Sequence, residues 1–143
     1  MEAEFTRENL GYLLAKASQR WNELLYERFV REGYPEVRPS YGSVLVPLFE
    51  EDGLRMGELA RRARLSKQTM TTLVRLAERD GLVSRIRDAK DARAFRVFLT
   101  ERGRGFRAVA ARVVSEIDAL AAARLSRADL AVLKQSLKGV MEL

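Results

Sequence analysis

The sequence predicts a mainly α-helical fold with a small β-hairpin, an α+β class, on three observations. Apolar residues recur at helical spacing over two long stretches, from Phe5 to Arg31 and from Thr100 to Met141. Two short stretches, 82–87 and 94–99, alternate like strands, and the second is rich in aromatic and β-branched residues. Of the 143 residues, 47% are apolar, which is enough for a packed core.

The segment 57–100 predicts a helix, a turn, a second helix and the hairpin. Ser66 is a good N-cap for the second helix, Lys67–Asp80, because its hydroxyl can accept from a first-turn N–H. Gly81 ends that helix, since glycine takes the left-handed conformation without a Cβ clash. Residues 88–93 form a polar turn between the two strands. The pattern is therefore that of a helix-turn-helix followed by a wing.

The predicted second helix has an apolar face and an opposite polar face. The apolar residues, which must be buried, are Met70, Leu73, Val74 and Ala77. The polar residues are Gln68, Thr72, Arg75 and Arg79, with Thr71 at the edge. Glutamine can bond adenine, arginine can bond guanine, and threonine offers a hydroxyl and a methyl group. The face suits base readout, although plain exposure explains each residue taken singly. Arg79 can equally complement the helix dipole or pair with Asp91 or another acid.

Basic residues concentrate on this motif. From Arg61 to Arg107 there are 14 Lys or Arg against 5 Asp or Glu, while the remainder has 12 against 15. A solvated face is the ordinary explanation of a basic run, but its coincidence with a helix-turn-helix favours phosphate neutralisation. Candidates for phosphate anchoring near the helix start are Ser66, Lys67 and Thr69. Further backbone contacts are expected from Ser40, Tyr41, Arg62 and Arg64.

The chain has no cysteine and no histidine, which excludes disulfides, thiolate metal sites and imidazole bases. The acidic run 50–52 is expected to be a solvated helix end, so no metal and no cofactor is predicted. No carboxylate pair or activated nucleophile is evident, and an enzyme is the least favoured class. No stretch is long and apolar enough for a membrane span, and the start is acidic, so a cytoplasmic protein is expected.

Three regions are predicted: an N-terminal dimerisation helix within 1–35, a winged helix-turn-helix within 36–100 and C-terminal dimerisation helices within 101–143. Pro39 is expected to open a helix that is kinked or irregular at Pro47. Leu54 and Arg55 are expected as a short third strand, and Thr100 and Ser126 as caps of the last two helices. The terminal helices carry more apolar surface than the lobe can cover. Either they close an intramolecular three-helix bundle, or two subunits interlock, which we favour.

Several motifs in this order resemble the MarR family of transcriptional regulators over nearly the whole chain: Glu58-Leu59-Ala60, Leu65–Thr69, Leu76–Val83, Asp88 with Asp91-Ala92-Arg93, and Leu99–Arg104. The resemblance implies a triangular homodimer whose winged lobes grip a pseudo-palindromic operator. Members usually repress transcription, and many lose DNA affinity when a small, frequently aromatic, anionic ligand binds between the dimerisation and DNA-binding parts.

The resemblance also implies roles in the hairpin. Arg93 would enter the minor groove, with Asp91 as its structural partner, and an arginine gains there from the negative potential of narrow A·T-rich DNA. Arg85, Arg87, Lys90 and Arg96 would then line flanking phosphates. Phe95, Val97 and Leu99 share one strand face and are expected in the core. For a ligand pocket the candidates are Tyr12, Trp21 and Tyr41, although packing is the commoner role of such aromatic residues.

The sequence therefore predicts a sequence-specific double-stranded DNA-binding regulator, a dimeric repressor that is either constitutive or released from its operator by a small ligand. The alternative is a winged-helix module that binds protein or RNA without an effector response. The polar helix face and the lack of exposed stacking aromatics favour duplex DNA.

Overall fold

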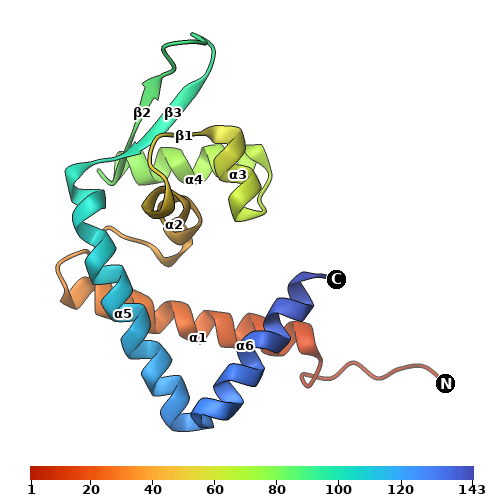
Figure 1. The fold of residues 1–143 in the computed structure, drawn as a ribbon. Coiled ribbons are helices and arrows are strands. Elements are labelled where there is room, and N and C mark those ends of the chain that lie inside the picture. The colour runs from red at the N-terminus through yellow and green to blue at the C-terminus, as the bar shows by residue number, and fades with distance from the viewer.

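The computed structural model describes all residues 1–143 and divides them into a winged lobe and a helical arm (Figure 1). The winged lobe contains η1 (Pro39–Tyr41), α2 (Gly42–Glu50), β1 (Leu54–Arg55), α3 (Met56–Ala63), α4 (Lys67–Arg79), β2 (Val83–Arg87) and β3 (Phe95–Leu99). The helical arm contains α1 (Leu10–Arg31), α5 (Glu101–Leu125) and α6 (Arg127–Met141). The wing hairpin projects from the lobe on the side away from α1 and α6.

The strands form one antiparallel sheet in the order β1-β3-β2. Val83 pairs with Leu99 at the base of the hairpin and Arg87 with Phe95 near its tip. Leu54 pairs with Val97, which confirms the predicted third strand. Because β1 leads directly into α3, the sheet ties the wing to the first helix of the helix-turn-helix.

Side-chain caps fix most helix starts. Ser66 Oγ accepts from Thr69 N at 3.1 Å, and Thr100 Oγ1 accepts from Gly103 N at 3.1 Å, as predicted. Ser126 caps α6 in the same way, accepting from Asp129 N at 3.1 Å. Helix α3 has no side-chain cap. Each cap satisfies an N–H that the helix itself leaves free.

Two expectations for the first helices were wrong. Helix α1 begins at Leu10 rather than near Phe5, because Asn9 caps it by accepting from Tyr12 N at 2.8 Å. The residues before it extend away from the fold, and Phe5 is 92% exposed. Helix α2 runs through Pro47 without a break, and the irregular turn is η1, ahead of it. The buried side chains Val44 and Leu48 hold the helix on both sides of that proline.

One continuous core joins the lobe to the arm. Its lobe part packs α2, α3 and α4 against the sheet through Leu48, Leu59, Met70, Val74 and Val97. In the arm, Phe29 of α1 meets Phe106 of α5 edge-on, with ring centroids 4.7 Å apart. Helix α6 packs on α5, yet none of its residues is buried, so the arm closes no three-helix core. Large apolar side chains remain exposed on the arm: Leu10, Leu13, Val114, Leu120, Leu125, Val132, Leu133 and Met141.

Candidate nucleic-acid interface

Helix α4 presents the polar face that its periodicity predicts. Met70, Val74 and Ala77 are buried in the lobe, whereas Gln68, Thr72 and Arg75 are exposed. The side chains of Gln68 and Arg75 make no hydrogen bond within the chain, so their amide and guanidinium groups are free for a ligand. Packing has fixed the rotation of the helix, and these side chains project from one outward surface.

Three hydroxyl groups at the start of α4 already donate hydrogen bonds within the chain. Ser66 Oγ donates to Thr69 Oγ1 at 2.9 Å, and Thr71 and Thr72 donate to the carbonyls four residues before them at 2.8 and 3.2 Å. These threonines can therefore accept a hydrogen bond or offer a methyl group without giving up a bond. The backbone N–H groups of Lys67 and Gln68 have no acceptor within the helix, which favours an anion at this end.

A buried carboxylate lies directly after β2, where the turn of the wing begins. The Asp88 side chain is 2% exposed and accepts from Lys90 N at 2.8 Å, Arg55 Nη2 at 2.7 Å and Arg96 Nε at 3.1 Å. The backbone hydrogen bond from Lys90, followed by the two guanidinium groups, lowers the pKa of Asp88. Arg96 also donates to the Gly53 carbonyl at 3.0 Å. The guanidinium of Arg96 is thus engaged inside the lobe, and its contact with a phosphate stays a prediction.

Two further wing arginines are held beside an aromatic ring. Arg85 bonds Glu78 of α4 through Nε at 3.1 Å, and its guanidinium lies 5.5 Å from the Phe95 ring centroid. Arg87 lies 5.1 Å from the same centroid and donates to the Ala92 carbonyl. Phe95 thus supports guanidinium groups rather than packing in the core, which corrects the prediction for it. Val97 and Leu99 are buried as expected. Arg85 links the wing to α4, while Arg87 remains exposed.

The tip of the wing carries an almost fully exposed cation. The Arg93 side chain is 94% exposed, and its Nε lies 3.5 Å from Asp91 Oδ1. That oxygen also accepts from Arg93 N at 3.0 Å, so the pairing with Asp91 that the resemblance implied is present. Lys90 is exposed beside it. The tip can therefore insert a cation into a groove ahead of the rest of the hairpin.

Three of the four candidates for additional backbone contacts are engaged elsewhere. Tyr41 is fully buried, so the phosphate contact expected of it was wrong. Arg62 lies among carboxylates, 2.9 Å from Glu58 and 3.1 Å from Glu51, and is already neutralised. Arg64 takes a left-handed conformation with φ 56° and donates to the Met141 carbonyl of α6 at 3.0 Å. Ser40 is exposed.

The Tyr41 hydroxyl connects η1 to the end of α4. It donates to Asp80 Oδ2 at 2.5 Å, and burial followed by this bond raises the pKa of Tyr41. Asp80 also accepts from Arg79 Nε at 3.1 Å, so the acid partner of Arg79 is Asp80 rather than Asp91. Arg79 first, then Tyr41, lowers the pKa of Asp80. No sequence pattern indicated this link, because its partners lie 39 residues apart.

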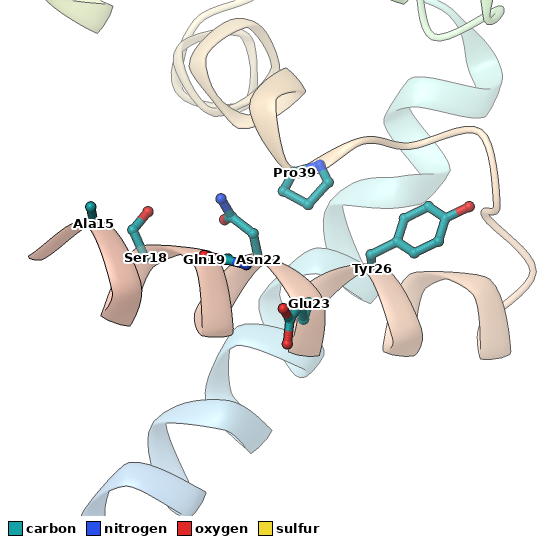
Figure 2. Close-up of a pocket in the computed structure, with 7 residues that line it drawn as sticks. All are labelled: Ala15, Ser18, Gln19, Asn22, Glu23, Tyr26 and Pro39. Carbon is teal, nitrogen blue, oxygen red and sulfur yellow. The ribbon is translucent and has the colours of Figure 1, made fainter. Parts of the chain in front are cut away.

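The aromatic residues expected to line a ligand pocket do not converge. Tyr12 and Trp21 lie nine residues apart on α1, which is a half-turn in projection, so they point to opposite sides of the helix. A shallow groove of about 630 Å³ instead follows another stripe of α1 and faces Pro39 (Figure 2). It is lined by Ala15, Ser18, Gln19, Asn22, Glu23, Tyr26 and Pro39. The groove thus lies between the helical arm and the winged lobe.

The structure contains neither a cluster of metal ligands nor a membrane-spanning helix. No group of three or more acidic side chains converges in a way that could hold a metal ion. None of the helices is long and apolar enough to cross a membrane.

Together, the exposed face of α4, the basic wing and the helical arm define a winged helix-turn-helix protein of the kind found among transcriptional regulators. The chain belongs to the MarR family. The sequence profile of that family matches residues 44–94.

The chain is 42% identical over 64 residues to the HTH-type transcriptional regulator TtmR of Methylorubrum extorquens, covering 45% of this chain and 33% of TtmR. It is 38% identical over 79 residues to the transcriptional repressor Rv2887 of Mycobacterium tuberculosis, covering 55% of this chain and 57% of that protein. In sequence, it therefore spans only part of the length of these relatives.

Solved structures extend the likeness over both parts of the molecule. Rv2887 in complex with salicylic acid superposes with a TM-score of 0.64 and 30% identity, covering 92% of this chain and 96% of that one. The repressor CouR bound to a 23-mer DNA duplex gives a TM-score of 0.78 and 26% identity, covering 97% and 99%. The arrangement of winged lobe and helical arm is thus that of the family.

Proposed function

We propose that this protein is a sequence-specific double-stranded DNA-binding transcriptional regulator that acts as a dimeric repressor. The observation that carries the proposal is the pairing of a free polar face on α4 with a fully accessible arginine at the wing tip. A helix of this kind fits the major groove, and an arginine on a hairpin fits the neighbouring minor groove. The DNA-bound structure of CouR supports the same use of the fold.

Each exposed side chain then has a distinct role. Arg75 and Gln68 can bond guanine and adenine edges, with Thr71 and Thr72 offering methyl and acceptor groups. Lys67 and the first N–H groups of α4 hold a phosphate, while Ser66 and Thr69 build the cap that presents them. Arg87 and Lys90 face flanking phosphates, and Asp91 orients Arg93 for the minor groove. Since binding alone explains these features, we propose no catalytic role.

The uncovered apolar surface of the arm supports the dimer. Exposed leucine and valine side chains on α1, α5 and α6 would be buried by a second copy of the chain. A two-fold dimer places two copies of α4 on one face of a duplex, where half-sites are separated by about 34 to 36 Å. The target is therefore proposed to be a pseudo-palindromic operator.

A small effector is proposed to bind the groove between α1 and Pro39. An occupant there touches both parts of the molecule and favours one relative orientation of them. Pro39 opens η1, which carries Tyr41, and Tyr41 bonds Asp80 at the end of α4. The salicylic acid complex of Rv2887 supports a small-molecule response in this fold.

The test is selection from a random duplex pool, followed by titration of the selected sequence. We expect a two-fold symmetric site and a strong loss of affinity in Arg93→Ala, with Arg20→Ala, an exposed arginine on α1, as the control. Absence of any symmetric preference would contradict the proposed function. Stronger competition by single-stranded RNA than by duplex DNA would support the alternative of an RNA-binding module.

A further inference from the structure

A charged cluster joins the hairpin of the wing to the start of the helix-turn-helix. Its residues are distinct from those proposed to face DNA. Asp88 directly follows β2, Arg55 is the last residue of β1, and Arg96 lies on β3. Arg55 approaches Asp88 Oδ2 through both Nε, at 2.9 Å, and Nη2, at 2.7 Å. The cluster therefore joins all three strands at the end of the β2–β3 ladder, where the turn of the wing begins.

The segment before β1 strengthens this connection. Asp52 Oδ1 accepts from Leu99 N of β3 at 2.9 Å, and the Gly53 carbonyl accepts from Arg96 at 3.0 Å. Gly53 has φ +73°, and a Cβ at this position would lie 2.7 Å from the Phe98 ring, so only glycine allows so close an approach. Beyond the cluster, the turn is held by the bond from Lys90 N to Asp88 Oδ1 at 2.8 Å.

Arg55 also explains an irregularity of α3. The residue before a helix usually accepts from a first-turn N–H, and Arg55 at this position makes no such bond. Its guanidinium is turned toward Asp88 instead, so the start of α3 is used to hold the wing. Asp88 lies five residues before Arg93, and its Oδ1 fixes the first part of the connecting turn.

We propose that Asp88 is the positioning residue of the wing: with Arg55 and Arg96 it orders the turn that aims Arg93 at the minor groove before DNA binds. This inference rests on the proposed function. Because the turn is ordered before DNA binds, binding loses less conformational entropy, and the affinity is higher for that reason.

Asp88→Asn separates positioning from simple electrostatics, because the two predict opposite signs. Removal of a negative charge near DNA should by itself strengthen binding, as we expect of Glu101→Gln, an exposed acid at the start of α5 with no bonded partner. If Asp88 positions the wing, Asp88→Asn weakens binding to the selected operator about three- to tenfold. In an Arg93→Ala background the same change should have less than about a twofold effect.

The experiment measures operator titrations of these variants together with their thermal unfolding and the hydrogen exchange of the Lys90 amide. Weaker binding, faster exchange at Lys90 and dependence on Arg93 would support positioning. Unchanged or tighter binding by Asp88→Asn would overturn it, as would an equal loss with and without Arg93. If Asp88→Asn fails to fold, Arg96→Lys in both backgrounds provides the same comparison. Should the wild-type protein show no operator preference, the proposed function itself has failed.

Discussion

Substitution of Gly103 by alanine would drive a methyl group into the backbone of the winged lobe. Gly103 lies in the first turn of α5, and an added Cβ would be 2.2 Å from the Leu82 carbonyl oxygen, whereas real Cβ atoms stay beyond 3.0 Å. Relief requires α5 to move away by about 1 Å, because a backbone atom cannot change rotamer. That movement would stretch the bonds from Thr100 N to the Leu82 carbonyl, at 3.0 Å, and from Thr100 Oγ1 to the Gly81 carbonyl, at 2.7 Å.

The expected loss combines three effects. Overpacking costs about 1 to 3 kcal/mol, and two weakened hydrogen bonds cost about 0.5 to 1.5 kcal/mol each. The higher helix propensity of alanine offsets about 1 kcal/mol of this destabilisation. Gly103→Ala should therefore lower the free energy of unfolding by about 1 to 5 kcal/mol.

Urea denaturation at a fixed protein concentration measures this change. The matched control is Gly57→Ala in the first turn of α3, where nothing lies within 4 Å of the added Cβ and a small gain in stability is expected. Because Gly103 seats the arm against the lobe that carries α4, operator affinity should fall as well. Equal stability of the two alanine variants would refute the reasoning.

Three further predictions concern the interface and its link to the core. Arg75→Ala should weaken operator binding by about 1 to 3 kcal/mol and relax the base preference at one position per half-site. An equal loss of affinity for all sequences would show that Arg75 contacts a phosphate and not a base. The logarithm of affinity should fall with the logarithm of salt concentration by about 0.9 per neutralised phosphate, and salt-independent binding would contradict the electrostatic role of the wing. Tyr41→Phe should lower the free energy of unfolding by about 1 to 2 kcal/mol, because it removes the hydrogen bond to the Asp80 carboxylate. The lowered pKa of Asp80 makes this contribution fully present above the ordinary value of 3.8 and lost as the pH falls through the pKa of the folded state. The difference in stability between the two proteins should therefore shrink as the pH falls below 3.8. A difference that stays constant as the pH falls would contradict the link.

Features set by local chemistry could be predicted from the sequence. Ser66, Thr100 and Ser126 cap their helices through a hydrogen bond between the hydroxyl and the N–H three residues later. This bond is local and does not depend on the surrounding structure. The exposed face of α4 follows from the spacing of its apolar residues, which leaves only one rotation of the helix. The order of helices and strands, and the accessible wing tip, were predictable for the same reason.

The sequence alone thus determined which segments form helices and strands and which face of α4 is exposed, because those features depend on neighbours a few residues away. Only the tertiary structure decided which basic side chains are free. Arg96 and Arg62 lie in the basic region like the exposed candidates, yet each is engaged by a group outside its own helix or strand. Arg96, for example, bonds Gly53, 43 residues earlier. A charge is available to a ligand only when folding brings no partner to it, and such long-range partners leave no periodic trace in the sequence.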